Sequence, residues 1–411
     1  MSGTQEPVTR MQRIIDFFVF KRGMVGLLAM VILVAMGEKM AERFLPLYLT
    51  ALGGGALAVG LLGYLDNQLS AIYSFFGGYI GERLGMKRAL RLFNFMAMLG
   101  YVLVIAVPSW PTALIGAMLF LSWTAISLPA TMDLVSGIAP KNKRAMGVTM
   151  HSLVKRIPMA IGPLVGGYCI DYWGRDIGMR IAFGVALAMT VLALVLQERL
   201  IHETSPRAQR RAELNPFNLM PLMNSDLRNL LMSDILVRFC EQIPAAFVVI
   251  WCCDLIANKV TAAQFGWLTT IEMATAVLCY VPVAYWADRL GKKPFVVMTF
   301  VFFTLFPVVL LYSQSFWPLA GAFIIRGLKE FGEPTRKALI MDLAPEDRKA
   351  AVFGLYYLLR DVIVAFAAGG GAVLWWFSPA LNLWAAFAFG VAGTVYFIVR
   401  GRDVKIIVAK E

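Results

Sequence analysis

The segment YIGERLGMKR at residues 79–88 has a second, similar copy in this chain. It returns about 205 residues later as YWADRLGKK at residues 285–293, with the acidic, basic and glycine positions in the same order. The same spacing relates Pro129 to Pro334, which lie outside the segment. An internal repeat of this kind is typical of membrane proteins that are built from two related helical bundles. We therefore interpret the chain as two copies of one structural unit.

Long apolar runs surround both copies. Of the 411 residues, 59% are hydrophobic and 16% are charged, whereas soluble domains average about 45–50% and 25%. This composition excludes a water-soluble globule, and continuous apolar runs exclude an outer-membrane strand barrel. Runs of about 20 apolar residues, each long enough to cross a bilayer, recur along the whole chain. The twelve expected spans are residues 23–50, 56–80, 90–107, 111–136, 146–170, 180–197, 229–254, 262–286, 295–313, 317–341, 350–376 and 380–399.

The basic residues indicate how these spans are oriented. Of the 38 Lys and Arg, 25 lie in the two termini and in alternate connections, whereas the opposite connections hold three. Because Lys and Arg concentrate on the cytoplasmic side, we expect a multi-pass protein of the plasma (inner) membrane with both termini in the cytoplasm. The net charge of +12 then reflects topology, and we expect no nucleic acid partner. The five cysteines lack metal-ligand spacing, so no metal and no cofactor is expected.

The repeated segment resembles the cytoplasmic signature between the second and third helices of the major facilitator superfamily, and the resemblance covers nearly the whole chain. It implies an all-α integral membrane fold, in which 12 transmembrane helices form two pseudo-symmetric six-helix bundles around a central cavity. The expected divisions are a cytoplasmic segment 1–22, an N-terminal bundle 23–197, a cytoplasmic linker 198–228, a C-terminal bundle 229–399 and a cytoplasmic tail 400–411.

The resemblance also implies a latch that holds the outward-facing state. In both copies an acid and several bases lie near helix ends, and Gly85 permits a tight turn. A basic loop that only sets topology would explain the same residues. The residues assigned to the latch and to related gates are Gly78, Glu82, Arg83, Gly85, Lys87, Arg88, Asp288, Arg289, Gly291, Asp133, Glu333, Arg336 and Asp361.

The fifth span contains Gly162, Pro163, Gly166 and Gly167, which resemble the antiporter signature of the superfamily. That signature is typical of exporters, so the resemblance favours efflux over import. Small residues and proline also let a kinked helix pack closely in any membrane bundle, which is the alternative explanation. Drug antiporters of the superfamily usually carry an Arg-Gly pair in the fourth helix. This chain has its Arg-Gly pair at Arg326 in the tenth, so their usual proton relay is not assumed.

Charged residues recur within or beside the apolar spans. A charge at the bilayer centre costs about 2.5–3.5 kcal/mol even on the lenient insertion scale, so each needs water or a partner. Several are three or four residues apart, as on one helix face, and such rows can line a pathway or neutralise one another as ion pairs. We assign proton coupling to Glu38, Glu42, Glu241 and Glu330, and substrate binding to Arg43, Asp66, Lys155, Arg156, Arg238, Glu272, Arg326 and Arg360.

The first span also carries the sequence Glu38-Lys-Met-Ala-Glu42-Arg43-Phe44. It is similar to the first-helix acidic signature of proton-coupled peptide transporters, although its acids are four residues apart where theirs are three apart. A carboxylate beside an arginine can release that ion pair when it is protonated. Proton binding can thereby be coupled to a conformational or substrate switch.

Together these features imply a secondary active transporter that moves a small polar or charged organic solute by alternating access, as a proton-coupled exporter. Expected partners are the small-molecule solute, protons and the lipid bilayer, and we expect a monomer. Three alternatives stay open: a proton-coupled importer of an anionic, zwitterionic or amphiphilic solute, a non-transporting receptor, and a membrane-embedded enzyme. An enzyme is not expected, because the two histidines are far apart and no Cys/His cluster is present. The absence of an ATP-binding loop argues against an ATP-driven pump.

Overall fold

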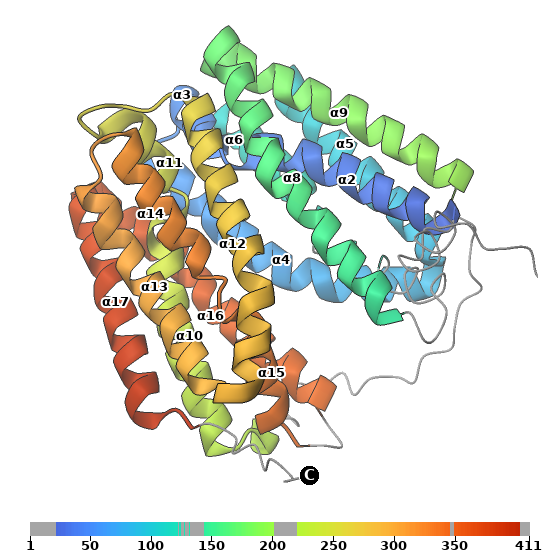
Figure 1. The fold of residues 1–411 in the computed structure, drawn as a ribbon. Helices are drawn as coiled ribbons and strands as arrows, with labels where there is room; N and C mark the ends of the chain where they lie inside the picture. Colours follow the sequence, from blue (N-terminus) through green and yellow to red (C-terminus); the bar gives the residue numbers. More distant parts are fainter. Residues whose placement is uncertain are drawn as a thin grey trace, which may run out of the picture.

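In this computed structural model the chain forms two helical bundles, drawn from blue to green and from yellow to red in Figure 1. The predicted all-α fold with two bundles is confirmed, and all regular structure in the described part of the chain is helical. The structure describes residues 22–121, 144–200, 220–345 and 349–402, together with Trp123, Thr124, Ser127 and Thr131. Predictions for the N-terminal segment, for Asp133 and for most of the linker and tail lie outside these residues.

Within the described residues the expected spans correspond to one helix or to consecutive helices, and of the expected span 111–136 the structure describes α6 and a few residues beyond it. The first bundle contains α2 (Arg22–Glu42), α3 (Leu45–Ala51), α4 (Ala56–Leu84), α5 (Met86–Ala106), α6 (Trp110–Phe120), α8 (Arg144–Trp173) and α9 (Arg175–Leu200). The second contains α10 (Ser225–Ala245), α11 (Val248–Ile250), the π-helix η3 (Trp251–Leu255), α12 (Ala262–Leu290), α13 (Lys293–Tyr312), α14 (Phe316–Leu328), α15 (Glu333–Leu343), α16 (Lys349–Phe377) and α17 (Pro379–Arg400).

Three spans are interrupted within their length, which the hydropathy pattern did not predict. The breaks separate α2 from α3, α10 from α11 and α14 from α15, and the second bends the span by 45°. Proline stands beside each break, at Pro46, Pro244 and Pro334. Because proline lacks an N–H and its ring clashes with the carbonyl four residues earlier, an uninterrupted helix is unfavourable there. Transporters commonly bind solutes and ions at such discontinuous helices.

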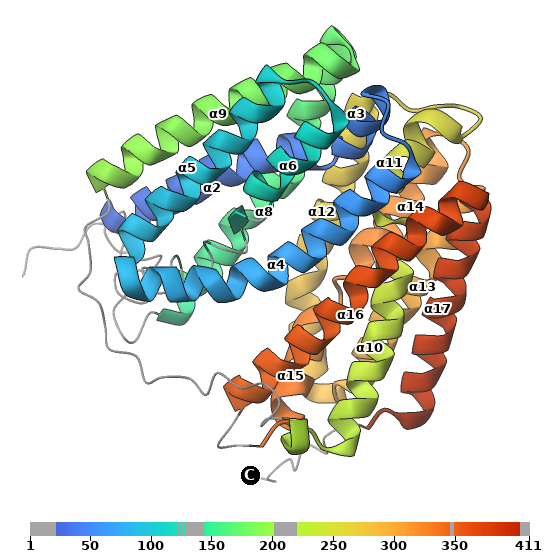
Figure 2. The ribbon, with the colours of Figure 1, turned by 180° about the vertical axis from the view of Figure 1, so that it is seen from behind.

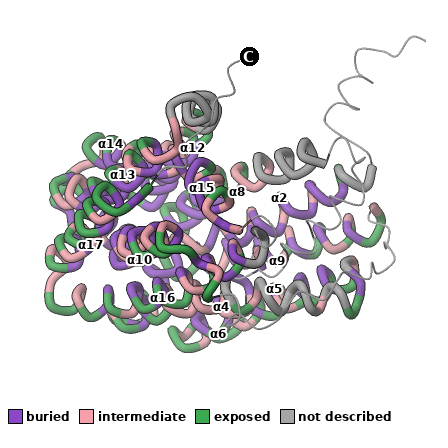
Figure 3. The backbone as a smooth tube through the Cα atoms, turned by 90° about the horizontal axis from the view of Figure 1, so that it is seen from below, coloured by how far each residue is buried: buried purple, intermediate pink, exposed green. Residues whose placement is uncertain are grey.

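The outer surface of the bundles is apolar. In the described residues, five helices are long and apolar enough to cross a membrane, and the bent pair of α10 with α11–η3 adds a sixth. On α17 the side chains of Trp384, Val391, Val395 and Ile398 are exposed, and Figure 3 shows exposed residues along the outer side of this helix. Large apolar side chains on an outer surface fit a lipid environment.

The two bundles meet at one end of the molecule and separate toward the other, as opposite views show (Figures 1 and 2). We call the first end the closed face; it carries the turns at Gly53, Gly174 and residues 256–261. We call the second end the basic face; it carries the turns at Gly85 and Gly291. The bundles contact each other through α8 with α12 and through α4 with α16.

The turns at Gly85 and Gly291 confirm the internal repeat in structural terms. Their φ angles are +84° and +88°, with ψ of 146° and 164°. This region of conformational space is essentially restricted to glycine. Glycine is therefore required at both positions to join one helix to the next within a single residue or two.

Candidate solute and proton site

The antiporter-like motif brings α8 close to two different neighbours. Gly162 and Gly166 face α2, and a Cβ atom added to Gly166 would lie 2.1 Å from the carbonyl oxygen of Met40. Gly167 faces the other bundle, where an added Cβ would lie 2.4 Å from the carbonyl oxygen of Ala262. The glycines thus let three backbones approach at distances that any side chain would prevent.

Two prolines of the same motif region, Pro158 and Pro163, lie inside α8. The carbonyl of Pro163 is also close to the other bundle, since a Cβ added to Gly266 of α12 would lie 2.7 Å from its oxygen. The α8–α12 contact therefore depends on small residues from both bundles.

The acids of the first span share one cation at the α2–α3 break. The ammonium of Lys39 lies 3.1 Å from Glu38 Oε1 and also hydrogen-bonds to Glu42. Glu38 is buried and accepts a further hydrogen bond from Thr124 Oγ1, 3.0 Å from Oε2. Two carboxylates on one lysine leave one negative charge in excess. This cluster can therefore take up a proton while its lysine keeps an anionic partner.

The acids of the second bundle are held more firmly. Glu241 accepts hydrogen bonds from Lys329 Nζ at 2.6 Å and from Arg238 Nη1 at 2.7 Å. Arg238 Nη2 also donates to Glu333 at 3.1 Å. Glu241 thus joins α10 to the α14–α15 break through Lys329, and Arg238, on the same helix as Glu241, makes a second link through Glu333.

Glu272 of α12 belongs to the same region. Its carboxylate is buried, with Oε1 3.4 Å from Arg326 Nε and 3.7 Å from Lys329 Nζ. The Arg326 guanidinium lies over the rings of Phe306 and Phe323, at 5.1 and 5.5 Å. Buried charges arranged in this way support each other and the contact between α12 and α14.

Asp234 and Arg336 form a fully buried ion pair in the second bundle. Asp234 and Arg336 are each 1% exposed and hydrogen-bond directly. Tyr356 donates a further hydrogen bond to Asp234 at 3.0 Å, and Arg360 Nη1 lies 3.6 Å from the same carboxylate. Arg360 also pairs with Asp361 at 2.6 Å. These groups tie α10, α15 and α16 together within one bundle.

Polar contacts also cross between the bundles. Arg156 Nη2 of α8 lies 3.3 Å from Glu330 Oε2, which stands at the α14–α15 break. Asn67 of α4 donates to Gln242 of α10 at 3.1 Å. Glu330, predicted as a coupling acid, is therefore part of an inter-bundle ion pair.

The closed face holds residues that the sequence reasoning missed. Asp171, near the end of α8, accepts hydrogen bonds from the backbone N–H groups of Ala262 and Ala263 at 2.9 and 3.0 Å. Arg175 and Asp254 form a second ion pair between the bundles. The available signal was that Asp171 follows the Gly-Gly pair by one helical turn.

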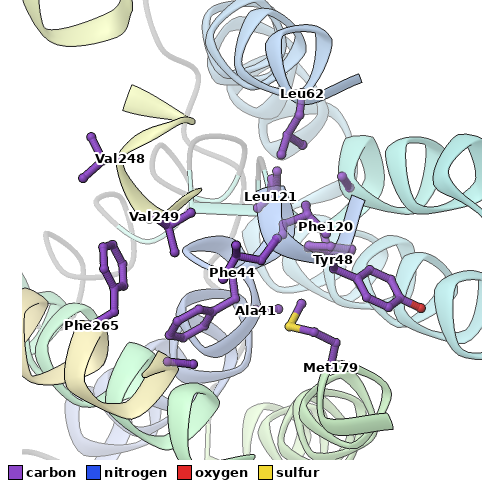
Figure 4. Packing of buried hydrophobic residues seen from close by; sticks show 14 of the residues in the cluster. Ala41, Phe44, Tyr48, Leu62, Phe120, Leu121, Met179, Val248, Val249 and Phe265 are labelled. Carbon is purple, nitrogen blue, oxygen red and sulfur yellow. The ribbon is translucent and has the colours of Figure 1, made fainter. Parts of the chain in front are cut away.

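An apolar layer separates this face from the charged clusters. Phe44 follows Arg43 directly and is fully buried. Its ring packs edge-on against Phe265 of the other bundle, with centroids 5.9 Å apart. Figure 4 shows Val249 of α11 beside these two rings. Charges at the α2–α3 break are therefore shielded from the closed face by packed side chains.

Three predicted substrate-binding residues stay outside these pairs. Among the described residues, Arg43, Asp66 and Lys155 form no hydrogen bond and no ion pair within 4 Å. All three are partly exposed. The other predicted substrate-binding residues, Arg156, Arg238, Glu272, Arg326 and Arg360, each pair with an acid or base.

The structure describes only some of the residues predicted to form the latch. Lys87 donates to the main-chain carbonyl of Glu198, 3.1 Å away at the end of α9. Its repeat counterpart Lys293 donates to the carbonyl of Gly401, 2.7 Å away beyond α17. A cation at a helix C-terminus is favourable, and both contacts stay within one bundle. Gly78, Glu82, Asp288 and Arg289 are not among the residues whose surroundings the structure describes.

Comparison with known proteins identifies the family. The family model described as Major Facilitator Superfamily matches residues 27–253 and 245–406. The multidrug resistance protein MdtG of Salmonella arizonae is 23% identical over 286 residues, which cover 67% of this chain and 69% of MdtG. The quinolone resistance protein NorA of Staphylococcus aureus is 27% identical over 180 residues, covering 42% of this chain and 43% of NorA.

Solved structures show the same fold at low identity. The peptide transporter POT in complex with sulfate superposes with a TM-score of 0.74 at 15% identity, covering 92% of this chain and 93% of that one. A mutant of the nucleoside transporter NupG gives a TM-score of 0.77 at 11% identity, covering 92% and 100%. With the family model matched over both bundles, the repeated turn and the glycine contacts of α8, this chain belongs to the major facilitator superfamily of membrane transporters.

Proposed function

We propose that this transporter is a proton-coupled exporter of a small charged organic solute. The observation that carries the proposal is the pairing of Glu38 and Glu42 with the single Lys39 at a broken helix. Uptake of one proton by this cluster changes how Lys39 is held, and thereby changes the balance of charge at the α2–α3 break. A proton can shift a conformational equilibrium only through such a difference between states.

Export is supported by two observations. The glycines of the antiporter-like motif let α8 approach the backbones of α2 and α12 closely. The relatives MdtG and NorA are named for multidrug resistance and quinolone resistance. A resident charge network of this extent favours a solute with a charged group over a purely apolar one, because desolvated charges need partners of opposite sign.

The proposed orientation places the basic face in the cytoplasm of a cell bounded by this membrane. Support comes from the excess of Lys and Arg in the connections on that side. In that orientation the bundles are apart on the cytoplasmic side and packed on the outer side, so the structure corresponds to the inward-facing state of alternating access. An exporter loads its solute in this state.

Flux in proteoliposomes tests the proposal. Compounds that raise the unfolding temperature of the purified protein are first selected as candidate solutes, because ligands that bind only the folded state stabilise it. Their movement is then followed under an imposed pH gradient. A proton antiporter moves solute in the direction opposite to the proton flow, whereas a proton symporter moves both in the same direction. Flux that is indifferent to the pH gradient would contradict proton coupling.

A further inference from the structure

Arg43 and Asp66 are charges of opposite sign that lack partners in the same neighbourhood. Within the described residues neither forms a hydrogen bond or an ion pair, although the two are close enough to interact electrostatically. Most other charged groups around them are paired, including the adjacent Glu42 with Lys39. An unpaired charge inside a membrane protein is costly, so it persists where water or a ligand supplies the missing interaction.

The position of Arg43 favours a ligand. It lies between α2, which ends at Glu42, and α3, which begins at Leu45, so it occupies the break itself. It also interacts electrostatically with Glu272 and Arg326 of the other bundle. Arg43 is therefore near charges of both bundles, and it directly precedes Phe44 of the apolar layer. A guanidinium presents a planar fork of donors that matches a carboxylate or phosphate.

Asp66 provides a complementary environment on α4. It lines a small cavity with leucine side chains from α4 and α6, among them Leu62, Leu65 and Leu114. The next residue along the chain, Asn67, hydrogen-bonds to the other bundle. Asp66 thus lies one residue from the boundary between the bundles, with apolar groups beside its carboxylate. The cavity itself, at about 10 Å³, has room for about one water molecule, so an ammonium group would reach Asp66 from its exposed side.

We propose that Arg43 and Asp66 form the two ends of a binding site for a zwitterionic organic solute. Arg43 binds the anionic group and Asp66 binds the ammonium, so the ligand bridges two charges that the protein leaves unpaired. This inference rests on the proposed transport function and specifies its substrate class. The third unpaired group, Lys155, interacts with Glu38 and Arg156 and marks the competing position for the anion.

Binding of matched probes to the full chain tests this site. The probes are straight-chain ω-amino acids of three to eight carbons, which vary the distance between the two charges, with hexanoic acid and hexylamine as single-charge controls. Affinity is measured by thermal shift and calorimetry in detergent, without any gradient. We expect at least one ω-amino acid to bind roughly tenfold to a hundredfold more tightly than either control, because each end adds a charge-assisted hydrogen bond.

Two variants test which residue binds which end of the ω-amino acid. Arg43→Gln is expected to lower the affinity for the ω-amino acid to that of hexylamine, and Asp66→Asn to that of hexanoic acid. The exposed residues Lys259 and Asp176 provide matched controls, since Lys259→Gln and Asp176→Asn remove the same charges far from the break. Circular dichroism and unfolding temperature report whether each variant is folded.

Three results overturn the proposal: equal binding of ω-amino acids and single-charge probes, unchanged selectivity in both variants, or loss of anion recognition in Lys155→Gln instead of Arg43→Gln. The transport proposal is tested separately from these three results. If ω-amino acids do not bind but another solute moves with the proton gradient, only the zwitterion site is wrong. If ω-amino acids bind as expected but no solute follows a gradient, the site stands and the coupling proposal is wrong.

Discussion

The carboxylate of Asp171 accepts a hydrogen bond from the backbone N–H of Ala262, 2.9 Å away in the other bundle. Its second oxygen accepts from the next N–H, at 3.0 Å, while Thr261 and Gln264 complete a capping box on the same helix. The N-terminus of α12 is thus capped partly by its own residues and partly by α8. Because the cap exists only while the bundles touch, it contributes stability to the closed face alone.

Replacing Asp171 by Ala should open the closed face more often. Loss of the cap is worth about 1–2 kcal/mol, which shifts the conformational equilibrium roughly fivefold to thirtyfold. Distances between spin labels at Tyr172 and Lys259, measured by DEER, should show a larger population with separated bundles. Asp176→Ala, an exposed acid on α9, is the control and should leave the distribution unchanged. An identical distribution in Asp171→Ala would show that the cap does not hold this face closed.

Replacing Gly166 or Gly167 of α8 by alanine should have different effects on stability and on closure of the bundles. Gly166→Ala pushes against the Met40 carbonyl inside one bundle and should lower the unfolding temperature, by an overpacking cost of about 1–3 kcal/mol. Gly167→Ala pushes against Ala262 of the other bundle and should mainly reduce closure, measured with the same spin labels. Gly184→Ala is the control, because no atom lies within 4 Å of its added Cβ. Equal effects of all three would refute the assigned contacts.

The Asp234–Arg336 pair should be essential for stability. Arg336→Met leaves a buried carboxylate without its main partner and should destabilise the bundle by about 3–5 kcal/mol. The double variant Asp234→Leu with Arg336→Met removes both charges and should regain much of that loss. Lys337→Met, at a side chain that is 51% exposed, should change stability by less than about 1 kcal/mol. Denaturation in detergent measures all three, and a double variant no more stable than Arg336→Met would contradict this account.

Replacing Glu42 or Glu241 by glutamine should distinguish an acid that couples transport to protons from one that holds the structure together. Glu42→Gln removes one of the two carboxylates on Lys39 and should abolish proton-driven flux while solute exchange without a gradient continues. Glu241→Gln loses the carboxylate that holds Lys329 and Arg238, so driven flux and exchange should both be lost. Both proteins should remain folded in the membrane. Wild-type driven flux in Glu42→Gln would rule out that residue as a coupling acid.

The Arg156–Glu330 contact should tolerate a charge exchange. Arg156→Glu alone places two acids together between the bundles and should reduce transport at least tenfold, since like charges are repelled in a weakly screened site. Adding Glu330→Arg restores opposite charges and should recover a substantial part of the rate. Flux of a selected solute in proteoliposomes measures both. A double variant as inactive as Arg156→Glu would indicate that the individual side chains, and not their pairing, matter.

Local sequence patterns predicted most of the fold. Apolar runs located the helices, because a bilayer requires a fixed length of apolar chain. The repeat predicted equivalent turns, and Gly85 and Gly291 do share a backbone conformation that other residues rarely adopt. The helix breaks beside Pro46, Pro244 and Pro334 were missed, although proline was visible at each, because hydropathy averages over the interruption. The cap by Asp171 was missed because it depends on a helix that begins 91 residues later.

The candidate site was predicted as a set of residues and not as an arrangement. Spacing along a helix identified Glu38 with Glu42, since residues four apart lie on one face. Spacing could not reveal that Glu330 pairs with Arg156, 174 positions away, or that Lys329 joins Arg238 on Glu241. The sequence by itself therefore determined the order of the apolar segments and which of them carry charge, because those properties follow from local composition. Only the tertiary structure decided which charges are paired and that Arg43 and Asp66 are not, because pairing depends on distances between helices that no local pattern contains.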